Sequence, residues 1–125
     1  MKISLLLTLV LLYGSCSSLV NPQNSQETLA VGLITARCAE LGNPDIDVRF
    51  SNGPPLTLDG QPAFMWTSVT HNMVTVYRDE VHDLKYTPEI INSYAKHECC
   101  HLFLGHNCST QTAETAADTC AKERF

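Results

Sequence analysis

Two histidines, His97 and His101, lie four positions apart, and a glutamate, Glu98, directly follows the first of them. On a helix this spacing brings both imidazoles to one face, where they can bind the same metal ion. Imidazole nitrogens are ligands that suit Zn²⁺, and a carboxylate beside the metal can take a proton from water without occupying a coordination position. The motif therefore predicts a zinc site with Glu98 as the general base.

A third ligand is expected from a second helix. Glu114 and Asp118 are one helical turn apart and follow the motif after a predicted turn at residues 105–109. If the two helices fold back on each other, His101 lies level with Glu114 and His97 with Asp118. We therefore expect Glu114 on the metal and Asp118 as the hydrogen-bond acceptor that holds His97 in one tautomer. The reverse assignment, with Asp118 on the metal, is the alternative.

This H-E-x-x-H followed by E-x-x-x-D resembles the gluzincin branch of zinc metallopeptidases, and the small size resembles the single-domain minigluzincins. The resemblance covers residues 25–122, and its specific part is residues 97–118. It implies a zincin-like fold, zinc as cofactor and a peptide or protein substrate. The residues to which it assigns roles are His97, His101 and Glu114 as metal ligands, Glu98 as general base and Asp118 as the partner of His97. For stabilising the oxyanion it leaves four candidates: His71, His82, Tyr86 and Tyr94.

Two other interpretations of the motif compete with an enzyme. The chain could be a non-catalytic secreted module that binds zinc, or an interaction domain in which H-E-x-x-H is accidental.

His106 follows the predicted helix end at Gly105, where we expect it to contact the last helix carbonyls, with metal ligation as the alternative.

The elements that must position these residues are read from periodicity and turn residues. A helix capped by Ser25 is predicted to about Leu41, a strand over 46–50, and a hairpin of strands over 63–69 and 73–77. Thr87-Pro88 opens a helix that ends at Gly105, and Ser109 or Thr110 caps a last helix to about Lys122. The order predicts an α+β domain with a small three-stranded antiparallel or mixed sheet.

Substrate contacts are expected on this sheet. The strand Met73–Tyr77 is the predicted open edge, to which a peptide can add as a further strand. Phe64, Met65 and Trp66 are expected in the core, with a substrate pocket as the alternative.

The amino terminus has the features of an export signal. Met1-Lys2 is followed by an apolar run over residues 3–12 that is too short to span a bilayer. We expect a signal peptide at 1–18, a metallopeptidase domain at 19–125 and a secreted or periplasmic protein. Tyr13-Gly14-Ser15-Cys16 also resembles a bacterial lipobox, and the alternative is therefore a lipid anchor on Cys16.

Five cysteines follow this leader, at positions 38, 99, 100, 108 and 120. In an oxidising compartment they predict two disulfides and one free thiol. Cys99 and Cys100 lie inside the motif but off the face that carries the histidines, and so bridges are favoured over metal ligation. Spacing does not give the pairing; a Cys99–Cys120 bridge, which would join the two site helices, is one arrangement that it permits.

Composition restricts the partners. The chain has 125 residues, enough for one domain, and a formal net charge of -5 at pH 7. No cluster of Lys and Arg occurs along it. We therefore expect neither a nucleic-acid-binding groove nor an electrostatic contact with an anionic membrane.

Overall fold

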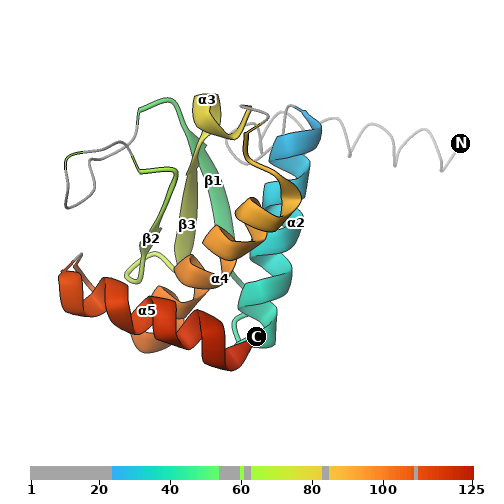
Figure 1. The fold of residues 1–125 in the computed structure, drawn as a ribbon. Coiled ribbons are helices and arrows are strands. Elements are labelled where there is room, and N and C mark those ends of the chain that lie inside the picture. Colours follow the sequence, from blue (N-terminus) through green and yellow to red (C-terminus); the bar gives the residue numbers. More distant parts are fainter. Residues whose placement is uncertain (1–23, 54–59, 61–62, 83–84, 109) are drawn as a thin grey trace, which may run out of the picture.

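The computed structural model describes residues 24–53, 60, 63–82, 85–108 and 110–125 (Figure 1). The leader predicted at 1–18, with Cys16, lies outside the described residues. Within them the elements are α2 (Ser25–Glu40), β1 (Asp47–Ser51), β2 (Met65–Ser68), β3 (Met73–Tyr77), α3 (Arg78–Val81), α4 (Pro88–Leu104) and α5 (Gln111–Arg124). The predicted α+β class is confirmed.

Most element ends follow from the capping residues. The cap of α2 is Asn24, whose side chain accepts from the Glu27 N–H at 2.9 Å, and not Ser25, which is the first helical residue. The Thr110 side chain caps α5 by accepting from the Ala113 N–H at 3.1 Å. One short helix, α3, was not predicted, because its four residues are too few for a helical hydrophobic period.

The sheet is mixed, with strand order β1-β3-β2. β1 pairs with β3 in parallel and β2 pairs with β3 antiparallel. β3 therefore lies in the middle, and the expectation that Met73–Tyr77 forms an open edge is wrong, because both of its sides are already paired. Among the described strands, β1 and β2 are each paired on one side only.

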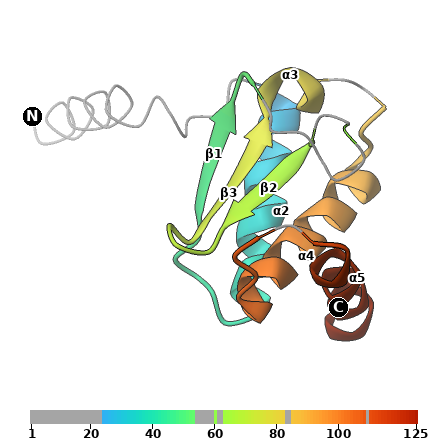
Figure 2. The ribbon, with the colours of Figure 1, turned by 90° about the vertical axis from the view of Figure 1, so that its left-hand side faces the viewer.

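The core lies between one face of this sheet and two helices. Val74 and Val76 of β3 are fully buried against Ile34 of α2 and Ile91 of α4. Figure 2 shows α2 and α4 together on that side of the sheet. Phe64 and Met65 are also buried in this core, as expected, and Trp66 is partly exposed. The motif helix, α4, also packs against the edge strand β2.

A buried carboxylate joins α2 to the segment after the sheet. The Glu27 side chain is fully buried and contacts Arg78 Nε at 3.3 Å and the His82 imidazole. A buried charge is tolerated only when it is paired in this way.

In the described part of the chain no helix has the length and hydropathy needed to cross a membrane.

Candidate metal centre

Helix α4 presents both motif histidines on one face. Its start is set by Thr87, whose side chain accepts from the Ile90 N–H at 3.3 Å, and by Pro88 at the first helical position. His97 and His101 are four positions apart on the helix, so the rings are neighbours, and their Nε2 atoms lie 3.0 Å apart. The predicted convergence of these two side chains is present.

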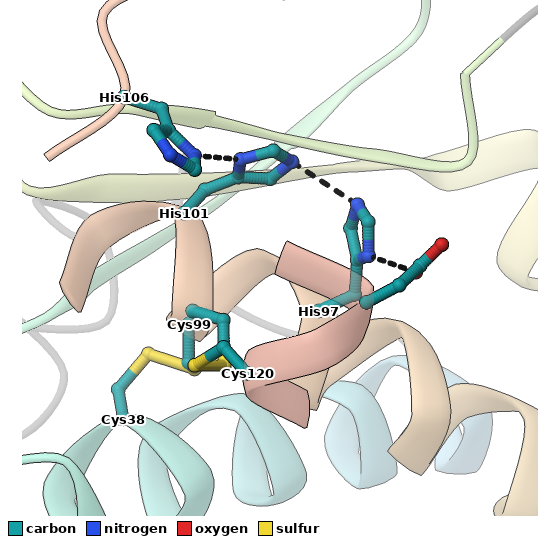
Figure 3. The surroundings of a disulfide bond; sticks show 8 residues. Cys38, His97, Cys99, His101, His106 and Cys120 are labelled. Carbon is teal, nitrogen blue, oxygen red and sulfur yellow. Dashed lines mark hydrogen bonds and ion pairs between the residues drawn. A yellow bond between two sulfur atoms is a disulfide. The ribbon is translucent and has the colours of Figure 1, made fainter. Parts of the chain in front are cut away.

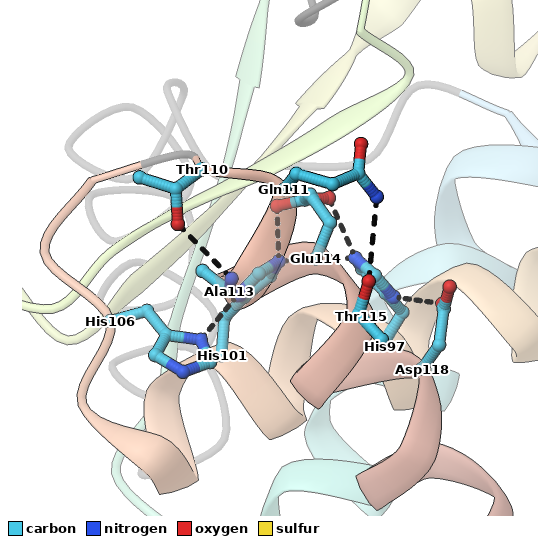
Figure 4. A network of polar contacts seen from close by, with 9 residues as sticks. All are labelled: His97, His101, His106, Thr110, Gln111, Ala113, Glu114, Thr115 and Asp118. Atoms are coloured by element: carbon cyan, nitrogen blue, oxygen red, sulfur yellow. Dashed lines mark hydrogen bonds and ion pairs between the residues drawn. The ribbon is translucent and has the colours of Figure 1, made fainter.

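Glu114 reaches the same point from α5. One of its carboxylate oxygens lies 3.1 Å from His97 Nε2 and the other lies 2.9 Å from His101 Nε2 (Figure 4). Asp118, one turn further along α5, contacts the opposite nitrogen of His97, with 2.8 Å between Oδ1 and Nδ1. Of the two carboxylates, Glu114 therefore faces the point shared by the histidines, and Asp118 lies behind His97.

The helices do not form the antiparallel hairpin on which this prediction was based. In an antiparallel hairpin, Arg124 near the end of α5 would lie beside Ile91 near the start of α4. Instead, the Arg124 guanidinium lies 4.7 Å from the ring centre of Phe103, near the end of α4. Figure 2 looks almost along α5 while α4 runs obliquely through the same view. The helices cross, and the hairpin argument places Glu114 and Asp118 correctly only because they lie near the crossing.

Glu98 is buried beside the histidines. One carboxylate oxygen of Glu98, one ring nitrogen of His97 and one of His101 all lie within 4.8 Å of one another. Burial raises the pKa of Glu98 well above its ordinary value, and the negative charge of Glu114 raises it further. Burial lowers the pKa of His101, although Glu114 acts in the opposite direction.

His106 occupies a place that neither sequence interpretation foresaw. Its Nδ1 lies 2.9 Å from Nδ1 of His101, on the side of that ring opposite to Glu114 (Figure 4). The side chain thus contacts the His101 ring on the side away from the shared point, while its backbone N–H donates to the His101 carbonyl at 3.1 Å. A sequence signal existed in Gly105, whose φ of 72° turns the chain back toward the helix end.

The two cysteines between His97 and His101 both form disulfides. Cys38 of α2 is joined to Cys99, and Cys100 is joined to Cys120 of α5 (Figure 3). The two predicted bridges are present, and Cys108 is the free, exposed cysteine of the described residues. The Cys99–Cys120 bridge that spacing permitted is not the one formed, because Cys99 faces the core under α2 while Cys100 packs against α5.

Of the four residues considered for an oxyanion contact, Tyr86 and Tyr94 lie together, with ring centroids 6.2 Å apart, and the two histidines have other partners. His71 is hydrogen-bonded within the β2–β3 turn, His82 contacts Glu27, and the Tyr86 hydroxyl donates to a carboxylate of α3. Tyr94 is on the motif helix, three residues before His97, with 38% of its surface exposed. It is the one of the four that shares a helix with the histidines.

The donor set fits a metal cation. His97 Nδ1 faces a carboxylate, which only accepts, so Nε2 of the neutral ring carries a lone pair. The two Nε2 atoms lie 3.0 Å apart, and each lies 2.9–3.1 Å from an oxygen of Glu114. Ligands at about 2.0 Å from a tetrahedral zinc lie about 3.3 Å from one another, which is close to this spacing. Electron-rich atoms held so near each other require a proton or a metal ion between them.

Comparison of the chain with protein-family models, curated proteins and solved structures gives no match. The gluzincin resemblance therefore stays a prediction from residues 97–118. Function has to be argued from the chemistry of the centre itself.

Proposed function

We propose that this protein is a zinc-dependent metallopeptidase in which His97, His101 and Glu114 hold the metal. The observation that carries the proposal is the meeting of two Nε2 atoms and one carboxylate within 2.9–3.1 Å, with a second, buried carboxylate beside them. When bound, Zn²⁺ would supply Lewis-acid chemistry, polarising a substrate carbonyl and making water easier to deprotonate. Two histidines with one glutamate is a ligand set of catalytic zinc sites.

Glu98 is the proposed general base. It takes a proton from the attacking water and returns it to the leaving amine, a transfer that requires a carboxyl close to the ligands. Asp118 accepts from His97 Nδ1 and holds that ring in the tautomer that leaves Nε2 free.

A peptide substrate is supported by the surface around the centre. β2 is an edge strand beside α4, and an extended peptide can pair with such an edge. Ile90 and Tyr94 are exposed at 40% and 38%, and they share with His97 one stripe of the helix. We propose that an apolar substrate side chain packs on this stripe while the scissile amide lies over the histidines.

Export is part of the proposal. The two disulfides are typical of proteins in oxidising compartments, and they agree with the leader predicted at residues 1–18. The lipid anchor at Cys16 stays an alternative within this prediction.

Metal content and turnover test the proposal together. Protein lacking residues 1–18 is dialysed against zinc and analysed for bound metal as wild type, Glu98→Gln and Glu89→Gln, the last an exposed carboxyl of the same helix. We expect one zinc per chain in all three proteins. Hydrolysis of peptides with apolar side chains should fall about 10²- to 10⁴-fold in Glu98→Gln alone.

Other outcomes separate the competing functions. A wild type that binds zinc but hydrolyses no peptide would favour a non-catalytic zinc module. A wild type without zinc would make the motif accidental. Loss of zinc in Asp118→Ala but not in Glu114→Ala would reverse the third-ligand assignment.

A further inference from the structure

A reversal of the chain at the end of α4 brings His106 back to the motif. Gly105 ends the helix in the left-handed region, at φ 72°, where a residue with a side chain would be strained. The His106 N–H then donates to the carbonyl of His101. As a result the two imidazoles come together, with 2.9 Å between their Nδ1 atoms.

The direction of this hydrogen bond follows from what His101 must do. Its Nε2 is the atom that faces His97 and Glu114, at 3.0 and 2.9 Å. An imidazole that binds a metal through Nε2 carries its hydrogen on Nδ1. In the pair of Nδ1 atoms, His101 is therefore the donor and His106 the acceptor, and the hydrogen of the neutral His106 ring is on its own Nε2.

The two ligand histidines thus have different outer partners. His97 donates to a carboxylate, Asp118, whereas His101 donates to a neutral ring. The His101 side chain is only 7% exposed, so water cannot readily replace a lost partner at Nδ1. Within the described residues, the polar contact of His101 Nδ1 is the one with His106.

We propose that His106 is the positioning residue of His101: by accepting from Nδ1 it fixes the tautomer and orientation in which Nε2 is presented to the metal. This inference rests on the proposed function. It assigns His106 no contact with metal or substrate, and it gives the turn at Gly105 a function in assembling the centre.

Zinc affinity of matched variants tests the assignment. The dissociation constant is measured by competition with a chromophoric chelator for wild type, His106→Leu, His106→Asn and the neighbouring Asn107→Leu. Removal of an outer partner should weaken zinc binding about 10- to 100-fold in His106→Leu. The Asn variant retains an acceptor oxygen near the position of Nδ1, so it should stay within a few-fold of wild type, and Asn107→Leu should bind zinc as wild type does.

Equal affinity of His106→Leu and wild type, or equal losses in the Leu and Asn variants, would overturn the inference. If His106→Leu does not fold, long-range ¹H–¹⁵N spectra of the zinc-loaded wild type decide. We expect hydrogen on Nδ1 of His101 and on Nε2 of His106, and hydrogen on Nδ1 of His106 would refute the proposal. A wild type that takes up no zinc would instead refute the proposed function, and this inference with it.

Discussion

Removing the Cys100–Cys120 disulfide by double alanine substitution should weaken zinc binding as well as folding, whereas removing Cys38–Cys99 should weaken mainly folding. Cys120 is on α5, and its bridge holds the helix that carries Glu114 against α4. The other bridge reaches α2, which carries no predicted ligand. Alanine is the suitable replacement, because all four cysteines are buried and serine would bury a hydroxyl group.

The expected magnitudes follow from the loops that the bridges close. Their sequence separations are 61 residues for Cys38–Cys99 and 20 for Cys100–Cys120. In the chain-entropy relation, the losses in free energy of unfolding are about 4 and about 3 kcal/mol respectively. Zinc at a thousandfold excess over Kd adds about 4.1 kcal/mol to the folded state. A tenfold weaker site loses about 1.4 kcal/mol of that gain.

Urea unfolding followed by the fluorescence of the single tryptophan, Trp66, measures both effects. Each double variant is made in a Cys108→Ala background, so that the free thiol cannot exchange with the remaining bridge. Unfolding is recorded in chelator and at fixed free zinc, and the difference between the two conditions is the stabilisation by zinc. We expect this difference to be smaller by about 1.4 kcal/mol or more in Cys100→Ala/Cys120→Ala.

Equal stabilisation by zinc in the two double variants would refute the idea that the Cys100–Cys120 bridge holds Glu114 in place. A protein without this bridge that unfolds in chelator at the wild-type urea concentration would refute the loop-entropy estimate.

Three further substitutions probe separate parts of the structure. Glu27→Gln should lower the free energy of unfolding by about 3 kcal/mol, measured in urea, because Arg78 loses a buried charged partner. In the metal-free protein the raised pKa of Glu98 makes the folded state bind a proton that the unfolded state releases, so stability falls as pH rises above 4.5. Thermal melting in chelator from about pH 4 to about pH 8 should show a smaller fall for Glu98→Gln. Asp118→Ala should weaken zinc binding about 10- to 100-fold in chelator competition.

Each of these has a control on the same helix. Glu40→Gln on α2, Glu89→Gln on α4 and Thr119→Ala on α5 change exposed residues. A control that behaves like its site variant would show that the effect belongs to the helix and not to the site. Parallel pH profiles for wild type and Glu98→Gln would contradict the role given to burial of that carboxyl.

Local sequence patterns were sufficient to predict the three long helices and the neighbouring positions of His97 and His101. Thr87-Pro88 and Gly105 mark both ends of α4, and four-residue spacing alone places His97 and His101 on one face. Thr110 likewise gives the start of α5. These signals are short in range, so no knowledge of the tertiary fold was needed.

Long-range pairing was harder to predict. A period of two in hydrophobicity is the same for an edge strand and a central strand, so the pattern of β3 could not show that it is paired on both sides. Glu27 has the sequence features of an ordinary acidic residue in a first helical turn, and only packing reveals that it is buried. His106 depends on the path of the chain after a left-handed glycine, which sequence spacing does not give.

The two adjacent cysteines of the motif bond to different helices, Cys99 to α2 and Cys100 to α5. Consecutive residues on an α-helix point about 100° apart. A rotation of α4 by that angle would bring only one of the two cysteines to the other's partner, so a chain with exchanged partners would have to distort α4 where it carries the histidines. Such an isomer would contain every proposed ligand, but the ligands would not converge. The correct disulfides thus fix the orientation in which α4 presents both histidines to Glu114, and disulfide mapping of a purified sample would report what fraction has the proposed ligands together.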